Sequence, residues 1–154
     1  MKILLGIIFM AVGVLVGKKS TDKYSSASKY YSSMLEFNRD LISNLEYKRV
    51  SVHALIKDKK YFSEDFSKTL NSAFGNDEDI FLPKYLDDAE KQQINDYLNN
   101  IGKSTKDAEL QFLKFAEHDI LKSVNKYAEE NKKYGDLGIK LGFAAGAAAF
   151  ILIL

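Results

Sequence analysis

Few side chains in this sequence have the type and spacing that catalysis or metal binding requires. The two histidines, His53 and His118, lie far apart in the chain, and the run Asp77-Glu78-Asp79 lacks the alternating ligands and the glycine of a calcium loop. The absence of cysteine excludes thiolate zinc sites, iron–sulfur clusters and cysteine nucleophiles. The sequence therefore predicts a protein that is not an enzyme and holds no cofactor or metal, with the acidic run forming a solvated turn.

The regular spacing of five glycines is the most specific pattern. Gly13 and Gly17 are four residues apart, and Gly138, Gly142 and Gly146 form two further steps of four. Because residues four apart share one face of a helix, these glycines would let two helix backbones approach closely. The pattern predicts helix packing through this face. It leaves open whether the partners are two helices of one chain, two copies of the protein in a homo-oligomer, or other membrane subunits.

These glycines lie in the two apolar ends of the chain. Residues 3–17 hold 12 apolar residues and three glycines without a charge, and residues 137–154 hold 14 apolar residues, three glycines and one lysine. A helix that crosses a bilayer needs about 20 mostly apolar residues. We therefore expect transmembrane helices over residues 1–17 and 137–154, each extended by its flanking residues. A cleaved signal peptide is the alternative for the first segment, and a buried core helix is the alternative for the second.

The segment between these ends, residues 18–136, is polar and close to neutral. It carries all 21 acidic residues and 20 of the 22 basic residues, for a net charge of −1. Such a charge gives no electrostatic reason to bind nucleic acid. The apolar ends are flanked on their inner sides by lysines, which predicts that residues 18–136 form a cytoplasmic domain of a membrane protein. These lysines are Lys18, Lys19 and Lys23, and then Lys126, Lys132 and Lys133.

Apolar residues in the first half of this segment follow steps of three and four, the spacing of amphipathic helices. The spacing predicts a helix over residues 29–49, after a linker or frayed helix start over residues 20–28. Ser51 and Ser63 stand where they can cap two further helices, and Gly75 stands where the second of these would end.

The second half of the segment predicts two more helices. Asp87 or Asp88 can cap a helix that Gly102 ends in a left-handed conformation. Ser104 starts the next helix, with Asp107 as its capping-box partner, and that helix could continue unbroken into the C-terminal apolar segment. The fold expected from the sequence is all-α: a bundle of about five or six helices, flanked by N- and C-terminal transmembrane helices.

Three stretches of this sequence resemble the stage III sporulation protein AB family of endospore-forming bacteria. The run Leu98-Asn99-Asn100-Ile101-Gly102-Lys103-Ser104 is similar to the family's turn between its last two soluble helices. Residues 132–139 resemble its lysine-rich start of the final membrane helix, and residues 30–49 resemble its first helix. The chain departs from the family at Thr105, since the family usually has Ser-Asp after the turn glycine.

The resemblance implies a structural subunit of the assembly that links mother cell and forespore during engulfment. It implies a location in the mother-cell membrane around the forespore, with the soluble domain in the cytoplasm. The fold would be similar to the cytoplasmic domains of type II secretion platform proteins. Because those platforms meet a cytoplasmic ATPase, the implied partners are the ATPase subunit and other membrane subunits of the same assembly. No catalytic residues carry over.

Two other interpretations remain open from the residues. The chain could be a small membrane-bound regulator or sensor, unrelated to sporulation, whose helical domain binds a ligand or partner. It could also be an exported helical protein, if residues 18–136 lie outside the cell.

Overall fold

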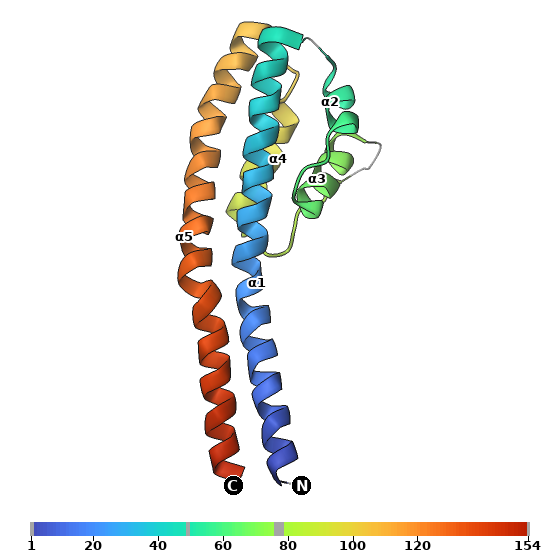
Figure 1. Ribbon diagram of the computed structural model, residues 1–154. Helices are drawn as coiled ribbons and strands as arrows, with labels where there is room; N and C mark the ends of the chain where they lie inside the picture. Colours follow the sequence, from blue (N-terminus) through green and yellow to red (C-terminus); the bar gives the residue numbers. More distant parts are fainter. Residues whose placement is uncertain (1, 49, 76–78, 154) are drawn as a thin grey trace. The chain divides into compact units, whose positions relative to one another are not determined.

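The computed structural model describes residues 2–48, 50–75 and 79–153, and within them it leaves out the side chains of some helical positions, among them 2–7, 9–10, 18–20, 136, 139, 149 and 152–153. The described residues form five α-helices and one π-helical turn, and they contain no strand (Figure 1). The elements are α1 (Lys2–Ser43), η1 (Asn44–Lys48), α2 (Val52–Asp58), α3 (Glu64–Phe74), α4 (Asp88–Asn100) and α5 (Lys106–Ile153). The predicted all-α class is therefore correct.

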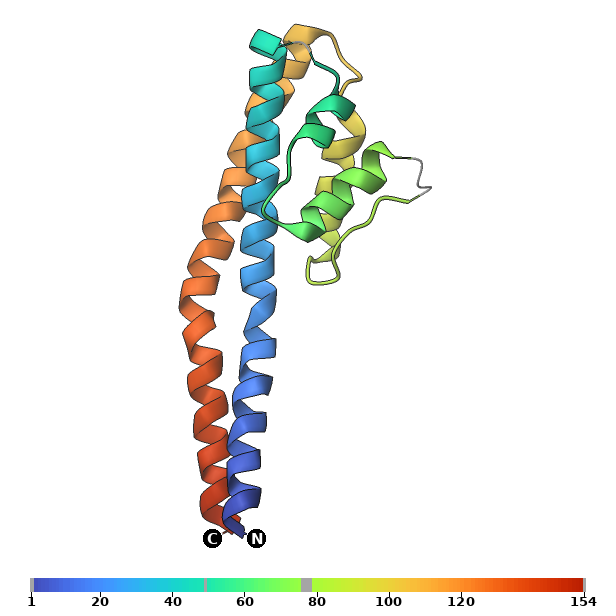
Figure 2. The same ribbon diagram turned by 45° about the vertical axis from the view of Figure 1, so that its right-hand side comes forward.

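The chain divides into two compact units, and α1 and α5 contribute to both. Unit 1 consists of Met1–Ser28 and Asn125–Leu154, and unit 2 consists of Lys29–Val124. Within unit 2, α2 and α3 lie side by side, as both views show (Figures 1 and 2). The expected limits of the apolar ends, residues 17 and 137, both fall inside unit 1.

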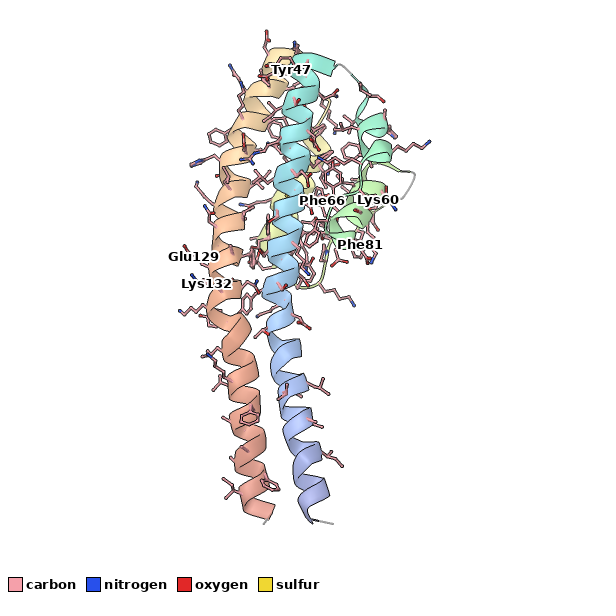
Figure 3. All side chains as sticks on the ribbon, viewed as in Figure 1. Tyr47, Lys60, Phe66, Phe81, Glu129 and Lys132 are labelled. Carbon is pink, nitrogen blue, oxygen red and sulfur yellow. The ribbon has the colours of Figure 1, made fainter. Side chains whose placement is uncertain are left out.

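Aromatic side chains fill the core of unit 2. Tyr30, Phe37 and Phe66 are fully buried. The Phe66 ring meets Tyr30 and Phe37 edge-on, with ring centres 5.3 Å and 5.9 Å apart. Figure 3 shows Phe66 between α3 and α1. Edge-to-face rings of this kind add to the hydrophobic gain of burial, so this cluster stabilises the packing of α3 on α1.

Side-chain caps begin three of the helices at the predicted residues. Ser51 and Ser63 accept the main-chain N–H three residues further on, at 3.3 Å and 3.2 Å. Asp87 accepts from the N–H of Glu90 at 2.8 Å, and the Glu90 carboxylate accepts the N–H of Asp87 at 3.2 Å, which completes a capping box. These caps satisfy N–H groups that have no partner inside their own helices.

The first helix is longer than the sequence predicts. Residues 20–28, expected to form a linker or a frayed start, lie inside α1, which continues to Ser43. The predicted end near residue 49 was close, because the π-helical turn η1 follows directly. Asn44 stabilises the chain beyond this turn: its amide group accepts from the N–H of Val50 at 2.9 Å and donates to the Val50 carbonyl oxygen at 2.5 Å.

Among the described residues, no helix contains a stretch both long enough and apolar enough to cross a bilayer. The expected transmembrane helices over residues 1–17 and 137–154 are therefore not supported by the structure. The described side chains form short uncharged runs, residues 11–17 in α1 and 141–148 in α5, against the roughly 20 residues that a crossing requires. The rest of both predicted spans includes side chains that lie outside the description.

Candidate functional site

The five regularly spaced glycines meet at the contact of α1 and α5 in unit 1. A Cβ placed on Gly13 would overlap the carbonyl oxygen of Gly142, and it would lie 3.4 Å from the backbone nitrogen of Gly146. A Cβ on Gly17 would likewise overlap the carbonyl oxygen of Gly138. Because higher numbers on α1 meet lower numbers on α5, the two segments are antiparallel. Within one chain, the backbones thus approach to a distance that only glycine allows.

An aromatic pair continues this contact. Tyr24 of α1 stacks on Tyr134 of α5, with ring centres 5.2 Å apart and an angle of 25° between the planes. The ammonium groups of Lys23 and Lys133 lie 4.7 Å and 5.2 Å from the centres of these rings. Both distances are within the range of cation–π attraction. On both helices, a tyrosine accompanied by a lysine therefore lies on the inner side of the apolar segment.

The turn between α4 and α5 departs from the prediction at one of its two residues. Gly102 has φ +77°, the left-handed region that favours glycine. Ser104 is not the helix cap, because α5 begins at Lys106 and the carbonyl oxygen of Thr105 accepts the N–H of Glu109 at 2.8 Å. Thr105 thus occupies the cap position, and the exposed Ser104 belongs to the turn.

Glu109 stabilises this turn through a hydrogen bond that the sequence did not predict. Its side chain accepts the N–H of Gly102 at 2.9 Å, and only 5% of the residue is exposed. The other carboxylate oxygen has no hydrogen-bond partner among the described residues. Burial, followed by the negative charge of Glu109, raises the pKa of Tyr97 above its usual value. An acidic residue in the first turn of a helix is ordinarily exposed, so spacing alone could not identify this role.

A buried asparagine joins three helices of unit 2. Asn38 of α1 is completely buried, and its amide nitrogen donates to the carbonyl oxygen of Leu113 in α5 at 3.0 Å. Tyr97 of α4 donates its hydroxyl to the Asn38 amide oxygen at 2.9 Å. Buried polar groups are costly unless they are hydrogen-bonded. Asn38 therefore fixes the register of α1, α4 and α5 within this unit.

An apolar groove of about 280 Å³ lies among these three helices within unit 2. Its walls are mostly apolar, and the Phe115 ring at its edge is 75% exposed. Asp96 and Asp119 supply the only charged groups among its lining residues, and both are acidic. The groove is lined by Tyr31, Met34, Gln93, Ile94, Asp96, Tyr97, Asn100, Phe112, Phe115, Ala116, Asp119, Ile120 and Ser123.

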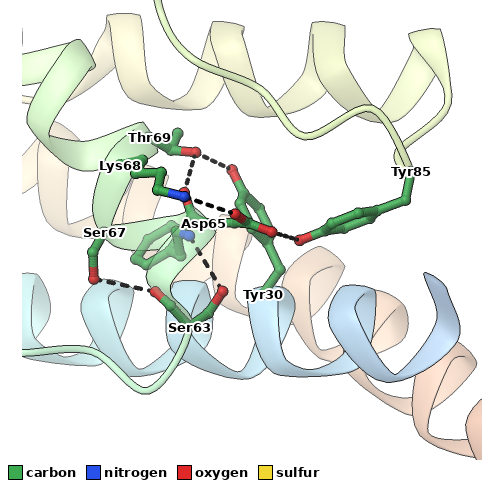
Figure 4. Close-up of polar contacts among 8 residues, drawn as sticks. Tyr30, Ser63, Asp65, Ser67, Lys68, Thr69 and Tyr85 are labelled. Atoms are coloured by element: carbon green, nitrogen blue, oxygen red, sulfur yellow. Dashed lines mark hydrogen bonds and ion pairs between the residues drawn. The ribbon is translucent and has the colours of Figure 1, made fainter. Parts of the chain in front are cut away.

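The polar groups on the α3 side of unit 2 form hydrogen bonds and an ion pair with one another (Figure 4). Tyr30 donates its hydroxyl to Thr69 at 3.1 Å, and Tyr85 donates its hydroxyl to Asp65 at 3.1 Å. Burial is the largest cause that raises the pKa of both tyrosines above the usual value. Asp65 also forms an ion pair with Lys68 at 3.6 Å.

A lysine between two acids lies nearby on the surface of unit 2. The Lys59 ammonium is 2.7 Å from a carboxylate oxygen of Glu36 and 2.7 Å from one of Asp40. Partial burial lowers the pKa of Lys59, but its hydrogen bonds to Asp40 and Glu36 raise the pKa by more. Tyr61 donates its hydroxyl to the same Asp40 oxygen at 3.2 Å. These contacts attach the segment before α3 to α1.

The two histidines are not brought together. His53 lies edge-on to Phe74, with ring centres 6.4 Å apart, and His118 is exposed on α5. In the described ranges, no group of three or more histidine, aspartate or glutamate side chains is arranged to hold a metal ion. Asp77 and Glu78 of the acidic run lie outside the described residues.

Residues 2–154, which are essentially the whole chain, match the family described as stage III sporulation protein AB. No match is found among curated proteins or solved structures. The expected likeness to type II secretion platform domains therefore stays a prediction. The family match indicates that the protein has a role in stage III of sporulation. The chain belongs to the stage III sporulation protein AB family.

Proposed function

We propose that this protein is a non-enzymatic, membrane-anchored component of the assembly that links mother cell and forespore. In this proposal, unit 2 faces the mother-cell cytoplasm and docks the ATPase subunit of the same assembly. Unit 1 anchors the protein and packs with other membrane subunits. Family membership supports the link to sporulation, and the groove of unit 2 is the observation that carries the docking role.

The groove has the chemistry of a protein-binding surface. A ring as exposed as that of Phe115 gains hydrophobic free energy when a partner covers it, and aromatic residues are enriched at binding hot spots. Asp96 and Asp119 are the charged lining residues. Asp119 lies 3.0 Å from the Lys122 ammonium. Asp96, in contrast, accepts from the neutral amide of Gln92 at 2.9 Å and keeps its negative charge facing the groove. A matching partner therefore presents apolar side chains flanked by lysine or arginine. We propose that the ATPase subunit carries such a surface.

The anchoring role rests on the sequence of the two ends. Residues 3–17 and 137–154 are apolar, and the lysines beside them favour a cytoplasmic location for the segment between. The close glycine contact of α1 and α5 supports a paired anchor, because small residues are what let helices associate within lipid.

A deletion strain that produces plasmid-encoded variants tests this function. Deletion should abolish heat-resistant spores and disturb recruitment of the other subunits, and the wild-type protein should restore both. The Phe115→Glu variant should fail to restore spores. Its matched control is Phe62→Glu, because Phe62 is also 75% exposed but does not line the groove. Normal sporulation of the deletion strain would contradict the proposed function.

A further inference from the structure

A second groove, of about 190 Å³, lies within unit 1 between α1 and α5. At one end it is lined by Lys23 and by the stacked rings of Tyr24 and Tyr134. At the other end it is lined by Leu137 and Leu141, which are 46% and 61% exposed. The groove therefore changes from a cationic and aromatic end to an apolar end.

The distance between the two ends of the groove matches the distance between the headgroup and the acyl chains of a lipid. Leu141 follows Tyr134 by seven positions on α5, which corresponds to about 10 Å along a helix. Tyrosines with lysines are typical of the membrane–water interface, where the ring lies at the headgroup level and the ammonium reaches the phosphate. The exposed Leu137 and Leu141, about 5 Å and 10 Å further along the helix, would lie at the depth of the acyl chains.

Gly138 allows α1 and α5 to pack closely beside this groove. A Cβ on Gly138 would overlap the Cγ2 atom of Thr21 and would lie 2.7 Å from the carbonyl oxygen of Gly17. A side chain at this position would therefore push the helices apart. The groove thus has a floor of closely packed backbone, with Leu137 and Leu141 left open at its side.

We propose that this groove binds one anionic phospholipid, with its phosphate near Lys23 and an acyl chain along Leu137 and Leu141. Charge complementarity favours this occupant, since Lys23 is the only charged residue in the lining and no acidic side chain of the described chain contributes to it. A basic pocket between helices is a recurrent headgroup site. The proposal rests on the membrane anchoring proposed above.

The test uses the full-length protein purified in a mild detergent. Native mass spectrometry measures the binding of phosphatidylglycerol and of phosphatidylcholine to the wild type and to Lys23→Gln and Lys23→Arg. The matched control is Lys126→Gln, because the Lys126 ammonium also lies 4.7 Å from the centre of a neighbouring tyrosine ring but does not line the groove.

The wild type should prefer one molecule of phosphatidylglycerol over phosphatidylcholine. Lys23→Gln should weaken that preference about fivefold, the effect of one lysine near an anionic headgroup, whereas Lys23→Arg and Lys126→Gln should keep it. Equal binding of both lipids, an unchanged preference in Lys23→Gln, or a lipid-free dimer that buries the groove would overturn the proposal. Flotation with pure phosphatidylcholine vesicles tests anchoring separately, because failure to float there contradicts the membrane anchor itself.

Discussion

Gly17 of α1 and Gly138 of α5 are in backbone contact, so that a Cβ on Gly138 would lie 2.7 Å from the carbonyl oxygen of Gly17. The contact joins residues that are far apart in the sequence, because the whole of unit 2 lies between them. It explains why glycines at steps of four recur at both ends of the chain. Each set provides one side of a single helix contact.

A larger side chain in this contact should separate the helices. We expect Gly142→Leu to lower the free energy of unfolding by about 1–3 kcal/mol, as overpacking does at other tight contacts, because a Cβ on Gly142 already overlaps the carbonyl oxygen of Gly13. Ala145→Leu is the control, since Ala145 is exposed on the same helix. Chemical unfolding of the full chain in detergent micelles measures both, and equal losses in the two variants would argue against the contact.

Removal of the buried amide of Asn38 should destabilise unit 2. In Asn38→Ala, the buried Tyr97 hydroxyl loses its acceptor, at a cost of about 1–3 kcal/mol for a buried group left unpaired, and the Leu113 carbonyl, which lies inside α5, loses its side-chain donor. The exposed Asn99 provides the control, and Asn99→Ala should change stability by less than about 0.5 kcal/mol. The measurement is again chemical unfolding, and a loss no larger than that of the control would count against the network.

Two glycine substitutions should change the stability of the protein in opposite directions. Gly102→Ala should cost about 1–2 kcal/mol, because alanine at φ +77° is strained although no atom lies within 4 Å of the new Cβ. Gly135→Ala should stabilise by up to about 1 kcal/mol, because Gly135 lies within α5 and its added Cβ would meet Asn131 Oδ1 at an ordinary 3.6 Å. Thermal unfolding of both variants checks the signs, and a stabilising Gly102→Ala would contradict the left-handed turn.

Stability should fall at alkaline pH. Burial raises the pKa of Tyr30 and Tyr97 in the folded chain, so each hydroxyl stays protonated there while it ionises in the unfolded chain near pH 10. The stabilisation is fully present below pH 10 and is lost as the pH rises further. Lys59 acts in the same direction, because its pKa is also raised in the folded chain. Unfolding free energies between about pH 8 and 11 should show this decrease, and a constant or rising value above pH 10 would contradict these burials.

Caps and periodicity were enough to predict α2, α3 and α4 in unit 2. Ser51, Ser63 and Asp87 bond to main-chain groups within three residues, so their roles depend on local sequence alone. The positive φ of Gly102 could likewise be predicted from the local sequence, because a glycine commonly follows the end of a helix. The length of α1 was not predictable in this way. Its residues 20–28 are mostly small, polar or charged, and they become helical because the helix continues on both sides of them.

The features that define the site come from contacts that helix periodicity alone does not reveal. Asn38 interrupts an apolar face and looks unfavourable until Leu113 and Tyr97 are placed beside it. Glu109 resembles an exposed first-turn acid until the turn at Gly102 brings a donor to it. The glycine spacing predicted a packing face, but the pairing of α1 with α5 required the structure.

Binding of the ATPase subunit tests the central claim most directly. Full-length protein in nanodiscs is titrated with the purified ATPase subunit, and the dissociation constants of the wild type, Phe115→Glu and Phe62→Glu are compared. The account predicts that Phe115→Glu weakens binding at least about tenfold, as the loss of a hot-spot aromatic does, and that Phe62→Glu leaves it unchanged. Equal affinities for all three proteins, or no binding by the wild type, would contradict the claim that the groove of unit 2 docks this partner.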